Sequence, residues 1–190
     1  MLKQSFLLLF VLLGTVFMMP ALETGGVTVP DTLTLEGGRG LLVLNGSGVR
    51  RKLGFKVYVA GLYTRAKTTD SRKIIQADEP MAISMFWKRG VSAQKISKVF
   101  SEGFEYAAGG DHEQLKGSID TFLRSVAEAR KTDIWRYVYL PDQGVSVYCN
   151  DHLKTRIPGL AFKKALFGIW LLEEDAFDGD KGLRAELLGK

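Results

Sequence analysis

The order of hydrophobic patterns along the chain constrains its fold more than any other feature. Residues 53–63 and 81–87 carry apolar side chains at alternate positions, as strands do, and residues 27–35 and 41–44 are shorter strand candidates. Helical spacing follows in residues 92–108 and 111–131, then a hairpin pattern in 134–149 and a last helix from about residue 159. Shorter helices are predicted at 71–77 and 183–188. This order indicates an α+β fold, with helices packed on one face of a largely antiparallel sheet.

Residues 1–21 have the pattern of a cleavable signal peptide. A basic start with Lys3 precedes an apolar run from Phe6 to Met19, which Pro20 and Ala21 end. The run is shorter than the ~20 apolar residues that a membrane-spanning helix needs. We therefore expect cleavage after Ala21, with an uncleaved anchor as the alternative. One domain is expected over residues 22–190, with no transmembrane segment after cleavage.

Charge and motifs exclude several classes of function. The formal net charge is +5, but basic and acidic residues are interspersed, so no nucleic-acid partner is predicted. The basic clusters at 50–52 and 154–164 are interpreted as solvated faces. The two histidines lack metal-spaced neighbours, so no metal site is expected, and no P-loop is present. The single cysteine, Cys149, lies in an apolar alternation and is interpreted as a small buried hydrophobe.

Two residues that can donate hydrogen bonds to an anion lie near the strand predicted at 53–63, one just before it and one within it. The preceding segment 45–48 contains Gly46 and Gly48 and is interpreted as a tight turn, since Arg51 stands where a dinucleotide fingerprint needs its third glycine. Arg50 offers a planar two-pronged donor, and Tyr58 adds a hydroxyl on the less apolar face of the strand. Together they can bind a carboxylate or an enolate oxygen. The alternative is an exposed arginine and a surface tyrosine, and the residues alone favour that alternative.

Several motifs together carry a resemblance to a known family. They are Leu-Asn-Gly-x-Gly-Val-Arg at 44–50, Lys-Val-Tyr-Val-Ala-x-Leu-Tyr at 56–63, and shorter matches at 29–33, 157–159, 164–171 and 187–189. The chain resembles the chalcone isomerase superfamily, in particular its bacterial exported chalcone-isomerase-like branch. The resemblance implies an open-faced, largely antiparallel sheet with helices packed on one face and a cleft between them. Together with the signal peptide it implies a periplasmic location.

The resemblance also implies site residues. Some members of the superfamily cyclise chalcones without a cofactor, and others bind fatty acids through an arginine and a tyrosine. Arg50 matches the arginine that guides the anion, Tyr58 falls where the enzymes have a threonine, and Lys98 matches the family lysine. The family tyrosine expected near Lys95 is absent. The implied catalytic set is Arg50, Tyr58 and Lys98, and the implied ligand-binding set is Arg50, Tyr58 and Lys95.

Three functions stay open at this point. The first is an exported protein that binds a small amphipathic carboxylate, such as a fatty acid, in the cleft between sheet and helices. The second is a cofactor-free isomerase (an intramolecular lyase) that acts on a chalcone-like or other carbonyl substrate. The third is an adaptor of the cell envelope whose cleft is vestigial. Catalysis is in question because, apart from Arg50, the catalytic positions are altered or ambiguous.

Overall fold

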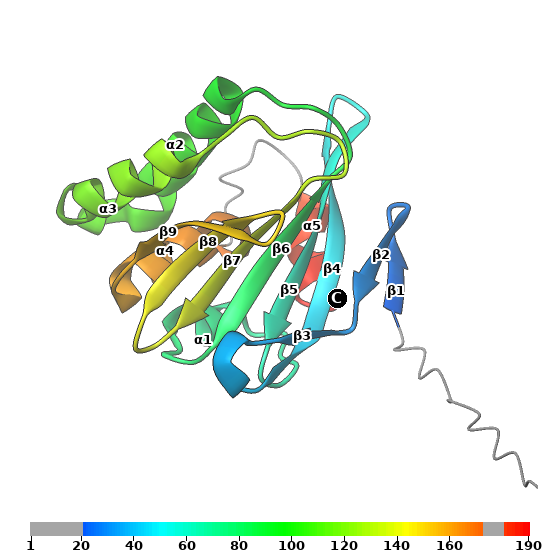
Figure 1. The fold of residues 1–190 in the computed structure, drawn as a ribbon, viewed down its shortest axis with the longest axis horizontal. Helices are drawn as coiled ribbons and strands as arrows, with labels where there is room; N and C mark the ends of the chain where they lie inside the picture. The colour runs from blue at the N-terminus through cyan, green and yellow to red at the C-terminus, as the bar shows by residue number, and fades with distance from the viewer. Residues whose placement is uncertain (1–20, 173–180) are drawn as a thin grey trace, which may run out of the picture.

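The computed structural model describes residues 21–172 and 181–190, so the expected signal peptide lies almost wholly outside the described residues. The chain forms a seven-stranded antiparallel sheet in the order β3-β4-β5-β6-β7-β8-β9, with a separate β1–β2 hairpin (Figure 1). The strands are β1 (Ala21–Thr24), β2 (Val27–Pro30), β3 (Thr32–Thr34), β4 (Leu41–Lys52), β5 (Phe55–Thr64), β6 (Met81–Trp87), β7 (Ile134–Leu140), β8 (Gly144–Cys149) and β9 (His152–Ile157). The helices are η1 (Glu36–Gly38), α1 (Ser71–Gln76), α2 (Ala93–Ala108), η2 (Gly109–Asp111), α3 (His112–Ser125), α4 (Leu160–Leu171) and α5 (Lys181–Leu187).

The five α-helices pack on one face of the curled, open sheet, which confirms the predicted α+β fold. Each strand of the sheet pairs with the next one along the chain. The main apolar core lies between this face and the helices, and it draws side chains from β5 to β9 and from all five α-helices. Among the described residues, no helix is both long and apolar enough to cross a bilayer.

The opposite face of the sheet carries a second, smaller core. Val29 of β2 and Leu35 next to η1 are buried there with Val49 and Val59 of the sheet. The β1–β2 hairpin covers this face closely, since a side-chain carbon added at Gly25 would lie 2.6 Å from Val49 Cγ2. Strand β5 is therefore buried on both faces from Tyr58 onward, whereas its alternation predicted a half-buried strand.

The segment at residues 45–48 lies inside strand β4, so its interpretation as a tight turn is wrong. Its glycines instead allow α5 to approach the strand. A side-chain carbon at Gly46 would lie 2.6 Å from the carbonyl oxygen of Leu187, and one at Gly48 would meet the Glu186 side chain. Asn45 Nδ2 donates to the carbonyl of Leu187 over 2.8 Å, and Glu186 Oε2 accepts from the backbone of Val49 over 2.9 Å. Two motifs far apart in the sequence thus form one contact.

Candidate functional site

Arg50 and Tyr58 lie side by side and buried, on the face of the sheet that the helices cover. They are register partners on β4 and β5, and Tyr58 is in turn the register partner of Trp87 on β6. Partners in an antiparallel pair point to the same face of the sheet. Tyr58 and Trp87 belong to the helix-facing core, and Arg50 is only 6% exposed. The interpretation of Arg50 and Tyr58 as exposed residues is therefore wrong.

Aromatic side chains fix the position of Tyr58. Trp170 of α4 donates from Nε1 to the Tyr58 hydroxyl over 3.1 Å. The Trp87 ring meets the Tyr58 ring edge to face, with centroids 5.4 Å apart. Edge-to-face pairs are favourable because the positive ring edge meets the negative ring face. A polar group from the sheet and one from the helix layer are therefore held together inside the core.

The same layer contains buried polar atoms without a hydrogen bond. Tyr137 on β7 is fully buried, and neither its hydroxyl nor Trp87 Nε1 has a hydrogen-bond partner among the residues that the structure describes. Burial raises the pKa of Tyr137 well above its ordinary value, and the nearby Tyr58 and Cys149 side chains add to this shift. Because unsatisfied buried polar atoms are rare in native proteins, each of them suggests a missing partner such as water or a ligand.

The two lysines expected at the site lie elsewhere. Lys95 and Lys98 are exposed on α2, whose buried stripe contains Ile96 and Phe100. Lys98 Nζ lies 3.8 Å from the carboxylate of Glu102, one turn further along the helix, and both side chains are in solvent. The structure therefore brings Arg50 and Tyr58 together but brings neither Lys95 nor Lys98 to them.

Aromatic residues of this layer were missed as site residues in the sequence. Trp87, Tyr137 and Trp170 lie at buried positions of their strands or helix, and such positions predict core packing. Periodicity shows that a residue faces inward, but it does not show which strand becomes its neighbour. The available signal was chemical, because each of these side chains carries an N–H or O–H group that needs a partner when it is buried.

Cys149 sits at the edge of the same layer, as a half-buried thiol packed against the core. Burial raises its pKa, and the negative charge of Asp133 raises it further. A raised pKa leaves less of the thiolate, which is the nucleophilic form. The interpretation of Cys149 as a small buried hydrophobe therefore holds in part, since the side chain packs against the core but is only half-buried.

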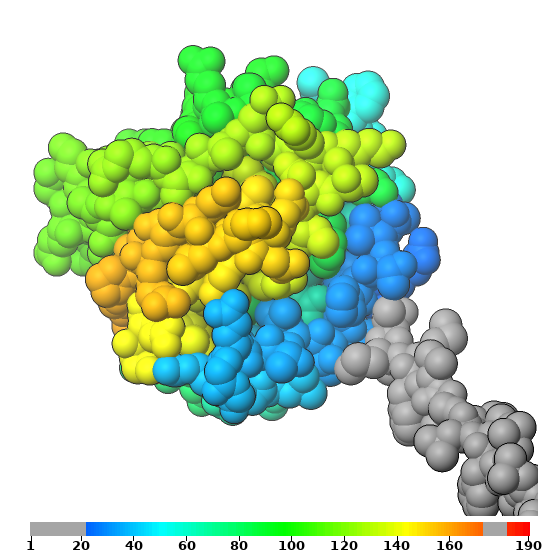
Figure 2. All heavy atoms as spheres, viewed as in Figure 1, coloured from blue at the N-terminus to red at the C-terminus, as the bar shows by residue number. Residues whose placement is uncertain are grey.

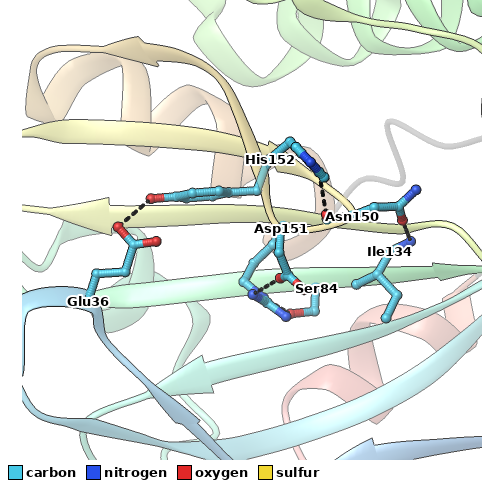
Figure 3. A network of polar contacts seen from close by, with 8 residues as sticks. Glu36, Ser84, Ile134, Asn150, Asp151 and His152 are labelled. Atoms are coloured by element: carbon cyan, nitrogen blue, oxygen red, sulfur yellow. Dashed lines mark hydrogen bonds and ion pairs between the residues drawn. The ribbon is translucent and has the colours of Figure 1, made fainter.

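A cavity of about 370 Å³ lies on the opposite face of the sheet from Arg50. Its polar wall includes Arg136, Arg39 and Glu36, and the last of these reaches toward strand β8 (Figure 3). Each of these side chains has a polar partner nearby, and so has Arg156 of the same wall, which donates from Nε to Ser146 Oγ over 3.0 Å. Arg136 Nη1 lies 2.9 Å from a carboxylate oxygen of Asp151, Arg39 pairs with Asp142 over 2.7 Å, and Glu36 accepts from a tyrosine hydroxyl over 3.2 Å. We therefore take the buried row that contains Arg50 as the candidate site.

An antiparallel sheet with helices packed on one face gives the class of fold, α+β. The model of the chalcone isomerase-like family matches residues 21–189, and the chain belongs to that family. A similar solved structure is the crystal structure of a fatty-acid-binding protein from Arabidopsis thaliana. It shares 16% sequence identity at a TM-score of 0.64, over 87% of this chain and 96% of that chain. At this identity the likeness shows the fold alone. No curated protein matches the sequence.

Proposed function

We propose that this protein binds a small amphipathic carboxylate, such as a fatty acid, between the sheet and the helices. The observation that carries the proposal is a buried row of polar groups inside an aromatic layer. The row is Arg50, Tyr58 and Trp87, and Tyr137 joins the layer through its contact with the Trp170 ring. The Tyr137 hydroxyl and Trp87 Nε1 lose their hydration without gaining a hydrogen bond among the described residues, which destabilises the core, and a ligand with polar atoms supplies the missing partner. An anion with an apolar tail suits this layer, because the anion can bind the polar groups and the tail can pack against the aromatic rings.

Arg50 is the group that binds the carboxylate in this proposal. Its guanidinium can donate two parallel hydrogen bonds to a carboxylate, and such charge-assisted bonds are about twice as strong as neutral ones. Tyr58 lies directly opposite Arg50, within reach of the same anion. Burial strengthens the attraction, since water screens a charge pair less inside a protein than at its surface.

The tail of the ligand requires the helix layer to open. A cavity of about 10 Å³ borders this layer, lined by Phe122, Trp135, Tyr137 and Cys149 among others. That volume holds a single water at most. A fatty-acid tail can enter at this cavity only if α3 moves away from the sheet. We therefore expect ligand binding to be coupled to a displacement of α3.

The likeness to a fatty-acid-binding protein of the same fold supports the proposal, and thermal unfolding tests it. A ligand that binds only the folded state stabilises that state, by about 2.7 kcal/mol at one hundred times its Kd. Palmitate should raise the Tm of the wild-type protein and leave the Tm of Arg50→Met unchanged. Methionine keeps the length of the side chain and removes its charge.

Arg51→Met is the matched control, because Arg51 is the exposed neighbour of Arg50 in the same strand. It should respond to palmitate as the wild type does. A circular dichroism spectrum checks that both variants fold. Equal responses of Arg50→Met and Arg51→Met would exclude Arg50 as the carboxylate-binding residue, and no response in any of the three proteins would exclude fatty acids as ligands.

The family relation also leaves a cofactor-free isomerase as a second candidate function. Arg50 suits a developing enolate or phenolate as well as a carboxylate. The exposed positions of Lys95 and Lys98 weaken this candidate, because catalysis needs donors aimed at the charge that develops in the transition state. Loss of chalcone absorbance with the wild type, abolished in Arg50→Met, would favour the isomerase.

We also propose that the chain is exported to the periplasm after cleavage near Ala21. The proposal rests on the sequence pattern of residues 1–21. The match to the family begins at residue 21, next to the expected cleavage site, which supports this boundary. N-terminal sequencing of the protein from a periplasmic extract should find a mature end at Leu22. An intact Met1 in the membrane fraction would instead indicate an uncleaved anchor.

A further inference from the structure

The turn between β4 and β5 carries a residue that the backbone does not favour. Leu53 and Gly54 form a two-residue turn between the paired residues Lys52 and Phe55, and both turn residues have positive φ, 51° and 79°. Such turns favour asparagine, aspartate or glycine at the first position, because a larger side chain strains the left-handed conformation. Leu53 is also 89% exposed, so its side chain packs on almost nothing. Folding alone does not explain a leucine here.

A second large, exposed apolar side chain follows two residues after Leu53, in the same hairpin. Phe55 is 63% exposed, and the guanidinium of Arg89, from the loop after β6, lies 5.2 Å from its ring centroid. Single exposed apolar residues are common on protein surfaces, but two at the end of one protruding hairpin form a patch. We call Leu53, Gly54, Phe55 and the adjacent cations Arg51, Lys52 and Lys56 the hairpin tip. It stands at the upper edge of the molecule (cyan in Figures 1 and 2).

The surroundings of the hairpin tip are basic. Lys88 and Arg89 follow β6, and the backbone of Lys88 is hydrogen-bonded to Val57 of β5 over 2.9 Å. The loop that precedes β7 is hydrogen-bonded to Trp87 through Thr132 and adds the exposed side chains of Arg130 and Lys131. The carboxylates on these segments and on β1 are Glu23, Glu128 and Asp133. Among the residues that the structure describes on these segments, cations therefore outnumber carboxylates.

We propose that the hairpin tip binds the surface of a bilayer that contains anionic phospholipids. Exposed apolar side chains ringed by lysine and arginine suit the boundary between headgroups and acyl chains, where the apolar groups enter and the cations meet phosphate. A purely apolar partner makes no use of the basic surroundings, and a purely anionic one leaves Leu53 and Phe55 in water. The inference does not depend on a ligand at Arg50, although Arg50 and Tyr58 lie at the base of the same hairpin.

A fluorescent label at the tip tests this proposal. The full-length chain, with Cys149→Ser to remove the single native thiol, carries an environment-sensitive dye on Phe55→Cys. A parallel chain carries the dye on Glu113→Cys, an exposed position of α3. Vesicles of phosphatidylcholine with phosphatidylglycerol should shift the emission of the tip label to the blue and leave the α3 label unchanged. Because the readout is local, partition of residues 1–20 into the vesicles does not mimic it. High salt should weaken the shift by screening.

Leu53→Asn separates membrane binding from folding. Asparagine before glycine is the preferred sequence of this turn, so the variant should unfold at the same or a higher urea concentration. It should nevertheless need about tenfold more lipid for half of the shift, since it lacks one buried apolar side chain. An unchanged lipid requirement would overturn the proposal. So would an absent shift, an equal shift with phosphatidylcholine alone, or the same shift with duplex DNA.

Discussion

Two tyrosines on β7 illustrate how differently a buried hydroxyl can be accommodated. Tyr139 donates its hydroxyl to Asp78, whereas the hydroxyl of Tyr137, two residues earlier, has no hydrogen-bond partner among the described residues. Both rings point into the core that faces the helices. An unsatisfied buried hydroxyl destabilises a protein, while a hydrogen bond to a carboxylate stabilises it. The two residues should therefore respond in opposite ways to loss of the hydroxyl.

We predict that Tyr137→Phe leaves the free energy of unfolding unchanged or raises it by up to about 1 kcal/mol. The matched variant Tyr139→Phe should lower it by about 1–2 kcal/mol, because it removes a bond to a charged group. Urea unfolding at neutral pH measures both. A loss in Tyr137→Phe as large as in Tyr139→Phe would mean that an ordered water already satisfies the Tyr137 hydroxyl.

At the scale of elements, short helices are held by a few specific contacts. Helix α1 is only six residues long and too short to be stable alone. The buried Lys163 of α4 donates from Nζ to the carbonyls of Ile74, Ile75 and Ala77, over 2.8, 2.9 and 2.6 Å, and so caps the end of α1. Helix α5 is held in a comparable way, by hydrogen bonds to β4 and by the close approach at Gly46.

Gly46→Ala tests the contact between β4 and α5. The added methyl group meets backbone atoms of α5 that cannot move independently, so we expect a loss of about 1–3 kcal/mol in the free energy of unfolding. Gly117→Ala is the matched control, since nothing lies within 4 Å of the added carbon and Gly117 is inside α3. It should gain about 0.5–1 kcal/mol through helix propensity. Equal effects of the two substitutions, measured by urea unfolding, would contradict this account of the glycines.

At the scale of the whole molecule, buried tyrosines make the fold sensitive to alkali. Burial raises the pKa of Tyr63 to about 12, and burial is also the main cause of the raised pKa of Tyr137, Tyr139 and Tyr148. The unfolded chain ionises near the ordinary tyrosine pKa of about 10, before the folded chain does. Above that pH the unfolded state therefore binds fewer protons than the folded state, and stability falls.

We predict that the free energy of unfolding decreases steeply as the pH rises from about 10 to about 12. Lys163 acts in the opposite sense, because burial lowers its pKa from the ordinary value of 10.5 to about 8. Between these two pH values the unfolded state binds more protons than the folded state, so this residue makes stability rise with pH. The four tyrosines outweigh it above pH 10. Phenolate absorbance should appear together with the loss of the circular dichroism signal. Phenolate formation by all tyrosines in a still folded protein would contradict the prediction.

The sequence predicted the helices and strands well, but it did not show which face of the sheet the helices cover. Alternation in β6 and β7 and the apolar stripes of α2 and α3 predicted those elements, because each pattern depends only on local geometry. Alternation in β5 did not show which face the helices cover, and Tyr58 proved to be on the helix-covered face. The hairpin that buries the other face comes from residues 21–30, far from β5 in sequence.

The candidate site could be predicted only in part. Arg50 was identified because the family motif identifies its position. Its burial beside Tyr58 follows from the pairing of β4 with β5, which the motif does not show. Lys95 and Lys98 were expected from the wider resemblance to the family but are exposed. The helical phase of Ile96 and Phe100 already placed these lysines away from the buried stripe, so local periodicity was the better guide for α2.

Native mass spectrometry of the protein mixed with palmitate tests the central claim most directly. We predict one bound fatty acid per wild-type chain and per Arg51→Met chain, and none on Arg50→Met. This result would assign carboxylate binding to the buried arginine. Palmitate bound equally by Arg50→Met, or bound by no variant under conditions that preserve the fold, would contradict the claim that Arg50 holds an amphipathic carboxylate.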